Sequence, residues 1–136
     1  MTNFKSVGKF HEQFGLPFVN DGTVPWVIPD EDFLYRYEHL HEELHELVVA
    51  QRDRDLPKVA DALADLVYVA LGTAHFYGIP FDDVFAEVQR ANMSKVRSLG
   101  KDDPRSKRRS HFDIVKPDGW TGPDIVGVLK ASGWEE

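Results

Sequence analysis

Two short stretches of the sequence carry carboxylates at helical spacing. They are EELHE at residues 42–46 and DALAD at residues 61–65. On a helix, residues three or four apart share one face, with about 5–6 Å between their Cβ atoms. Carboxylates placed in this way supply the oxygen ligands that a hard divalent ion such as Mg²⁺ prefers. The candidate metal ligands are therefore Glu42, Glu43, Glu46, Asp61 and Asp65.

The alternative is that these acids form an ordinary solvent-exposed helix face, which is the usual place for charged residues. Eight acids lie between residues 38 and 65, against three bases, Arg52, Arg54 and Lys58. All three bases fall at or near the expected helix ends, so none interleaves with the acids. Stacked like charges destabilise a helix unless a cation neutralises them. The pattern favours a metal site, and the exposed face stays the alternative for any one pair.

The composition indicates one folded domain of 136 residues, long enough for a single core. A formal net charge of −7 disfavours nucleic acid as a partner. The chain has no cysteine, which excludes disulfides, thiolate metal sites and a cysteine nucleophile. No apolar run approaches the ~18 residues of a membrane span, and the N-terminal residues lack an apolar signal-peptide core. We therefore expect a cytoplasmic protein with no membrane partner.

The periodicity of the apolar residues predicts an all-α chain. The expected elements are a helix at 2–14, an extended connector at 15–29, helices at 30–52, 55–78 and 81–96, a basic segment at 95–109 and a short amphipathic piece at 124–131. Asp30 and Asp55 are the expected N-caps of two of these helices. One domain is predicted over residues 1–136, with an N-terminal helix and connector at 1–29, catalytic helices at 30–97, and a basic loop and tail at 98–136.

The two acidic helices are predicted to pack through apolar stripes and to carry their acids on the other side. The stripe of the first helix holds Phe33, Tyr37, Leu40, Leu44, Leu47 and Val48. On the second helix, Tyr68 and His75 continue the line of the acids, and Gly72 leaves room for something to approach. This line of side chains predicts that the helix forms one wall of a binding site. The alternative is an exposed helix face that carries a tyrosine. Three histidines, His39, His41 and His45, fan out around the first helix and cannot converge on one ion.

The segment from Lys95 to Arg109 reverses the charge of the preceding helices, with seven bases and two acids. A basic segment beside an acidic metal site suits a polyphosphate, whose charge requires both magnesium and Lys or Arg side chains. A solvated flexible linker is an equal alternative, because Gly100, Pro104 and several serines lie in the same segment.

Several motifs together resemble the MazG-like all-α nucleoside triphosphate pyrophosphohydrolases, in particular the phosphoribosyl-ATP pyrophosphohydrolase-like members from phages and bacteria. The motifs are EExxE at Glu42, Glu43 and Glu46, the acidic pair one helix later, ADLVYVALGTAHFYGIP, and ANMSK at 91–95. KFHEQFGLP near the start and KPDGWTGPDI near the end are also similar, so the resemblance covers most of the chain. One position departs from the pattern: the family's second motif is ExxD, but residue 62 is alanine and the acid stands at Asp61.

The resemblance implies a bundle of four or five helices completed by formation of a homodimer or homotetramer. It implies two or three Mg²⁺ ions, with Mn²⁺ as a substitute, held by the carboxylates, with Glu43 as a ligand or as the base that activates water. The implied substrate contacts are Asn92, Lys95 and Arg97, to which the residue pattern adds Tyr68 and His75.

The predicted reaction is hydrolysis of a nucleoside triphosphate between its α and β phosphates, giving the monophosphate and pyrophosphate and controlling the nucleotide pool. A purine deoxynucleotide such as dGTP is slightly favoured as substrate. Three alternatives remain: the same chemistry on phosphoribosyl-ATP, a helical interaction module without catalysis, and a nucleic-acid binder that uses the basic segment.

Overall fold

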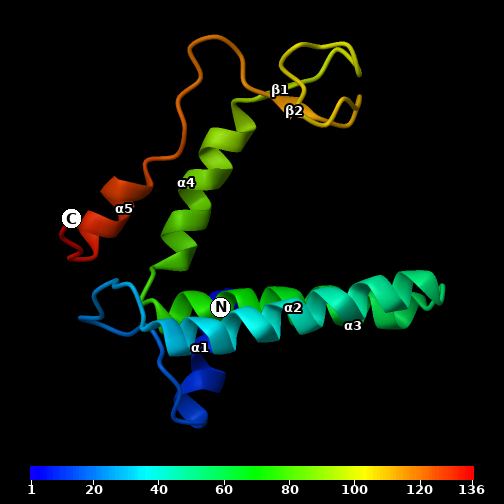
Figure 1. Ribbon diagram of the computed structural model, residues 1–136. Helices are drawn as coiled ribbons and strands as arrows, with labels where there is room; N and C mark the ends of the chain where they lie inside the picture. The colour runs from blue at the N-terminus through cyan, green and yellow to red at the C-terminus, as the bar shows by residue number, and fades with distance from the viewer.

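The computed structural model describes all 136 residues and confirms the all-α prediction. The elements are α1 (Asn3–Gln13), α2 (Asp30–Arg52), α3 (Leu56–Phe76), α4 (Phe81–Met93), β1 (Val96–Arg97), β2 (Ile114–Val115) and α5 (Ile125–Ala131). The long helices α2 and α3 form an antiparallel hairpin, and α1 packs across α3 (Figure 1). Helix α4 leads away from the hairpin and carries the two short strands and α5, so the chain has an open shape.

Local capping explains most of the helix boundaries. The Asp55 side chain accepts a hydrogen bond from the Lys58 N–H at 3.1 Å and starts α3, as predicted. The predicted cap at Asp30 is wrong, because Pro29 occupies the N-cap and Asp30 lies inside the first turn. The end predicted for the fourth helix is also wrong. Helix α4 stops at Met93, and the chain then enters β1, which pairs with β2 in an antiparallel arrangement.

The apolar core lies between α1 and α3, and His75 is at its centre. The core cluster consists of Phe4, Val7, Leu71 and Ala74, with Val19, Ile79 and Phe81 packed against it. The His75 ring stacks on Phe4 at 3.9 Å between centroids. Its Nε2 lies 2.8 Å from the Phe4 carbonyl oxygen, and its Nδ1 accepts a hydrogen bond from the Val19 N–H at 2.9 Å. His75 therefore joins α1, the connector and α3.

The predicted packing faces of α2 and α3 are wrong. Phe33, Tyr37, Leu44 and Val48 are about half exposed, whereas Glu43 is buried against α3. On α3, Leu63 and Val67 are likewise half exposed, and Ala62 is buried. The acidic side of the hairpin is therefore turned inward, and the strongest apolar stripes face outward. The reason is that α1 covers only one end of the hairpin, so two helices alone cannot bury all of their apolar surface.

Gly72 makes room for protein side chains rather than for a ligand. A Cβ atom at this position would lie 2.8 Å from Arg36 Nη2 and 2.8 Å from His11 Nε2. Both of these side chains are buried. The prediction that Gly72 opens the wall of a site is therefore wrong, because this space is already filled.

The basic loop, residues 98–113, is an ordered structure built around two buried carboxylates. Asp103 accepts hydrogen bonds from the Leu99 N–H and from Arg105, and Asp113 accepts them from Ser106 and Arg108. Arg105 holds the pKa of Asp103 well below its usual range. The Ser106 hydroxyl, with further donors, lowers the pKa of Asp113 to about 2. Charged hydrogen bonds thus replace an apolar core in this loop.

Three side-chain contacts hold the segment after β2 against α4. The indole N–H of Trp120 donates to the Ala91 carbonyl at 2.8 Å. Arg90 donates to the Gly122 carbonyl at 3.1 Å, and the Asp124 N–H donates to the Glu87 carboxylate at 2.9 Å. Trp120 thus docks this segment against α4.

Helix α3 is the one helix long and apolar enough to cross a membrane by length and composition alone, with a mean hydropathy of 1.3 over its most apolar window. It packs against both α1 and α2. It also carries Asp65 towards the acids of α2, and 33% of its most apolar window is buried in the structure.

Candidate metal centre

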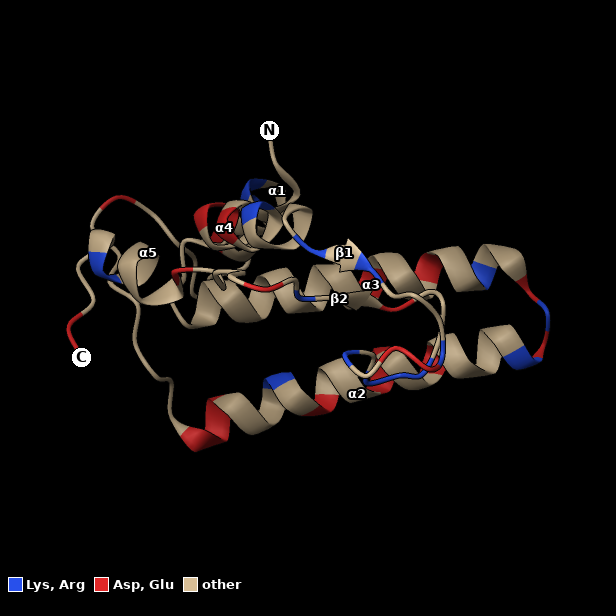
Figure 2. Cartoon of the chain, turned by 90° about the horizontal axis from the view of Figure 1, so that it is seen from above, with Lys and Arg blue, Asp and Glu red and all other residues tan.

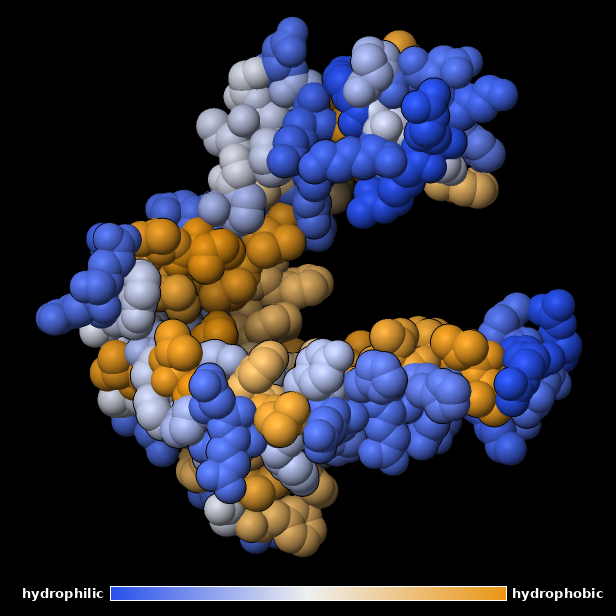
Figure 3. All heavy atoms as spheres, in the orientation of Figure 1, coloured by the Kyte–Doolittle hydropathy of each residue, from blue (hydrophilic) through white to orange (hydrophobic).

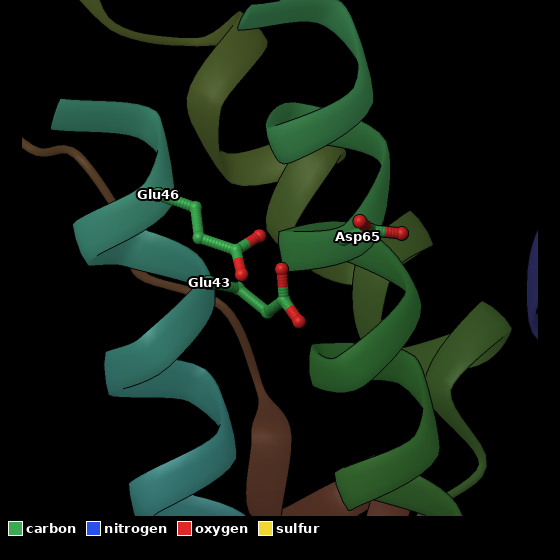
Figure 4. A group of neighbouring side chains, drawn as sticks. All are labelled: Glu43, Glu46 and Asp65. Atoms are coloured by element: carbon green, nitrogen blue, oxygen red, sulfur yellow. The ribbon is translucent and has the colours of Figure 1, made fainter. Parts of the chain in front are cut away.

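Three carboxylates from two helices converge between α2 and α3. Glu43 and Glu46 project from α2 towards Asp65 on α3 (Figure 4). One oxygen from each residue lies within 4.8 Å of the others. Glu43 is buried, Asp65 is half-buried and Glu46 is exposed, so the cluster is open to solvent on one side. These three residues are the part of the predicted ligand set that the fold brings together.

Glu43 is the residue whose environment departs furthest from that of an ordinary surface acid. Its side chain is 12% exposed, and its Oε2 atom has no hydrogen-bond partner in the protein. Burial and then the neighbouring carboxyls, first that of Glu46, raise the pKa of Glu43 to about 7. A buried carboxylate oxygen without a donor is costly for the fold unless a cation or a proton binds it.

No lysine or arginine neutralises the cluster. The one basic group within 4 Å of its acids is His39, whose Nε2 lies 3.5 Å from Glu43 Oε1. Glu46 and Asp65 form no ion pair with any base. The i,i+4 spacing between His39 and Glu43 is visible in the sequence, but only the burial of Glu43 distinguishes His39 from the other two histidines on this helix.

The donor set fits a hard divalent cation. Two oxygens that bind one Mg²⁺ lie at most about 4.2 Å apart, given ligand distances near 2.1 Å. The observed spacing within 4.8 Å therefore requires only small side-chain adjustments. The unpartnered oxygen of Glu43 and the absence of a neutralising base fit the same ion.

The other two predicted ligands, Glu42 and Asp61, lie outside this group of three. Glu42 is exposed on α2, although it is close enough to Glu43 to contribute to its raised pKa. Asp61 is exposed on α3 and borders, together with Glu46, a hollow of about 350 Å³. Ala62, which stands where the family motif has glutamate, is buried and lines the same hollow. The face of α3 that turns towards α2 thus carries Ala62 where the family motif would supply a fourth acid to the cluster.

This arrangement predicts unequal roles for the two aspartates of α3. Asp61→Asn should lower the apparent affinity for Mg²⁺ only a few-fold, because an exposed acid outside the cluster acts mainly through screened charge. Asp65→Asn should lower it by at least about tenfold, since it removes a direct ligand. Isothermal titration of Mg²⁺ into both variants measures the difference. Equal losses would show that Asp61 is also a ligand.

Two of the predicted substrate contacts, Asn92 on α4 and Lys95 just before β1, border a separate hollow. Asn92 and Lys95 line a hollow of about 500 Å³ together with residues of the basic loop and β2. Arg97 is tied to the loop, because its Nε–H donates to the His111 carbonyl at 3.0 Å. None of the cluster acids lines this hollow. Figure 3 shows an open gap between this part of the chain and the hairpin.

The two predicted substrate contacts on α3 occupy packing positions. Both ring nitrogens of His75 are engaged with backbone groups, so neither is free for a substrate. Tyr68 is 40% exposed, and its ring makes an edge contact with Phe10 at 5.4 Å. The structure gives His75 a structural role and leaves Tyr68 at a surface that α1 partly covers.

Comparison with known proteins places the chain in a family. A segment of 84 residues, 60% of this chain, is 33% identical to the uncharacterized protein L479 of Acanthamoeba polyphaga mimivirus. That segment spans about a third of the length of the viral protein. Residues 7–92, more than half of the chain, match the phosphoribosyl-ATP pyrophosphohydrolase family, and this range contains all five predicted metal ligands. The chain therefore belongs to this family, within the MazG-like all-α pyrophosphohydrolases, as its motifs predict.

Proposed function

We propose that this protein hydrolyses a nucleoside triphosphate to the nucleoside monophosphate and pyrophosphate in a reaction that depends on Mg²⁺. The observation that carries the proposal is the convergence of Glu43, Glu46 and Asp65 without a neutralising base. Such a cluster destabilises the fold unless a cation binds it, and family membership supports a pyrophosphohydrolase activity.

Each carboxylate has a distinct role in this proposal. Glu46 and Asp65 hold the cation, and Glu42 adds negative charge at its exposed side. Bound Mg²⁺ would neutralise the phosphate oxygens and make a water molecule more acidic. Glu43 either completes the ligand set or accepts the proton of the attacking water. The water oxygen bonds to the α phosphorus, the bond from that phosphorus to the bridging oxygen breaks, and pyrophosphate leaves.

Phosphoribosyl-ATP is the second candidate substrate, because the matching family is described by this activity. It contains the same α–β phosphoanhydride, so the cluster would serve both reactions without change. The two candidates differ only in the group attached to the phosphates and not in the acids that hold the metal.

Release of pyrophosphate from each common NTP and dNTP, dUTP and phosphoribosyl-ATP tests the proposal directly. The assay is run with Mg²⁺, with Mn²⁺ and with EDTA. Metal-dependent release from a nucleoside triphosphate is the expected result. Release from phosphoribosyl-ATP alone would assign the second candidate. Absence of release from every compound, together with absence of Mg²⁺ binding, would identify a helical interaction module.

We also propose that a second copy of the chain covers the outward apolar faces. Leu44 and Val48 on α2 and Leu63 and Val67 on α3 are each 49–56% exposed. Apolar groups gather over the lower part of α4 and along the side of the hairpin that faces the gap (Figure 3). Exposed apolar surface of this extent is typical of a protein interface. A partner hairpin would complete a four-helix bundle.

Leu44→Glu is expected to convert the assembly to monomers, because it places a charge in the apolar contact. Light scattering coupled to size-exclusion chromatography measures the mass of the particle. Arg52→Gln is the matched control, since it lowers the charge of the same helix by one unit at an exposed position. A wild-type protein that elutes as a 15.5 kDa monomer would contradict the proposal.

A further inference from the structure

The part of the chain beyond the family match contains a strongly basic hollow. It has a volume of about 450 Å³ and lies between the end of α4, the basic loop and β2. The cationic residues that line it are Lys95, Arg105, Lys107, Arg108 and Lys116. Asp113 is the single acid in its lining. Figure 2 shows several bases (blue) together with acids (red) in the loop between β1 and β2, and further acids along α2 and α3.

The charges of this hollow are only partly neutralised within the protein. Arg105 pairs with Asp103 at 3.0 Å, and Arg108 pairs with Asp113 at 2.8 Å. Lys107 forms no ion pair, and neither Lys95 nor Lys116 has a carboxylate within 4 Å. Three ammonium groups therefore surround one concave surface without a counter-charge.

Two of these ammonium groups are held over one aromatic ring. Lys95 Nζ lies 5.2 Å, and Lys116 Nζ 4.9 Å, from the centroid of the Trp120 ring. The ring itself is fixed by its hydrogen bond to the Ala91 carbonyl. Cation–π contact partly compensates each lysine, but it supplies no full negative charge. An anion in the hollow would supply one.

We propose that this hollow binds a polyphosphate group, and that Lys107 and Lys116 are two of its ligands. A polyphosphate matches the three uncompensated charges, and the hollow has the volume of a small-molecule site. The arginines still offer N–H groups, since their pairing with Asp103 and Asp113 orients them without using every donor. No residue of α2 or α3 lines the hollow, so the site is distinct from the acidic cluster and the inference does not depend on hydrolysis.

A nucleic-acid backbone is a less suitable ligand for this surface. Proteins that bind nucleic acid usually present a basic stripe along one face and carry a positive net charge. Here the unpaired lysines line one hollow, and the chain has a net charge of −7. These features favour a short, highly charged anion.

Isothermal titration of inorganic tripolyphosphate into the full-length protein tests the site. EDTA is present, so that the acidic cluster holds no metal and repels the anion. We expect binding that weakens with added salt. The double variant Lys107→Gln/Lys116→Gln should raise the Kd by about tenfold or more, because two charge-assisted contacts are lost. Neither lysine makes an ion pair, so the melting temperature should be retained.

Lys101→Gln is the matched control, because Lys101 is exposed on the same loop and does not line the hollow. It should leave the Kd within about twofold of the wild-type value. Absence of tripolyphosphate binding, or an equal effect of the control and the double variant, would overturn the proposal. Binding of a single-stranded oligonucleotide without tripolyphosphate binding would also overturn it.

Nucleotide kinetics identify the source of the polyphosphate. A raised KM with unchanged kcat in the double variant would show that these lysines also contact the phosphates of the substrate. An unchanged KM with weakened tripolyphosphate binding would show a site for free polyphosphate, and both results support the proposal. The titration requires no turnover, so it remains interpretable if no nucleotide is hydrolysed.

Discussion

Replacement of Glu46 by Gln or of Asp65 by Asn is expected to reduce pyrophosphate release by more than about a hundredfold. Each change keeps the size of the side chain and removes one negative oxygen from the cluster. Mutation of a residue that only hydrogen-bonds to a metal ligand typically lowers affinity or activity by about 10–100-fold. Loss of a ligand itself should therefore cost more. Glu46 lies on α2 and Asp65 on α3, and the cluster requires a ligand from each helix.

The same substitutions should leave the metal-free fold intact or make it more stable. Glu43, Glu46 and Asp65 repel one another, and no lysine or arginine offsets this repulsion. Removal of one charge therefore lowers the electrostatic cost of folding. A variant that loses both activity and stability would indicate a structural role instead of a catalytic one.

Pyrophosphate release at saturating Mg²⁺ and thermal unfolding in EDTA measure the two effects separately. Glu38→Gln is the matched control for Glu46→Gln, because Glu38 is an exposed acid on the same helix outside the cluster. It should keep activity within about twofold of wild type, since exposed charges away from a site are largely screened. Wild-type turnover in Glu46→Gln or Asp65→Asn would contradict the metal centre.

The stability of the metal-free protein is expected to depend on the protonation of Glu43. Its pKa is about 4.5 in an unfolded chain and rises to about 7 in the fold, where burial and the adjacent Glu46 disfavour the charged form. Between these values the folded state binds more protons than the unfolded state, so stability falls as the pH rises from 4.5 to 7. The difference across this range should be about 1–3 kcal/mol.

Two buried histidines have the opposite effect on how the stability of the fold depends on pH. Burial lowers the pKa of His11 and of His75, so the fold disfavours their charged forms. As the pH falls below 6.5, the unfolded chain binds their protons more readily, and the fold loses stability. A pH titration of the wild-type protein alone would therefore combine opposing effects.

Comparison of wild type with Glu43→Gln isolates the carboxyl group, because both proteins keep the histidines. In EDTA, the variant should melt above wild type at pH 8, and the difference should shrink towards pH 5. Mg²⁺ should raise the melting temperature of wild type most at high pH, where Glu43 is ionised, because a ligand that binds only the folded state stabilises it. A difference that does not change with pH would show that Glu43 titrates normally.

Features that depend on neighbouring residues follow from the sequence alone. Asp55 caps α3 through a backbone N–H three residues away, and Gly78 ends the turn that follows α3 with a positive φ of 66°. The helical spacing of Glu43 and Glu46 is equally local, since any helix brings such residues to one side. The motif order also indicated the family to which the chain belongs. Local hydrogen bonding and helix geometry suffice for these conclusions.

Only the tertiary structure decided which face of the hairpin is buried. Two faces of α2 compete for contact with α3, and the sequence favours the one with Leu44 and Val48. The fold instead buries Glu43, which raises its pKa and leaves its Oε2 without a partner. The same choice places Ala62 inside and Asp61 outside, although the two residues are adjacent in the chain.

The folded structure of the basic loop also could not be predicted from the sequence alone. Gly100, Pro104 and the serines suit a flexible linker, yet Asp103 and Asp113 organise the loop from within. The hollow arises because α4, the loop and β2 meet there, which brings Lys95 and Lys116 over Trp120. Lys95 and Lys116 are 21 positions apart in the sequence, and no helical or strand periodicity relates them. Contacts between distant residues depend on the packing of the whole chain, which local patterns do not contain.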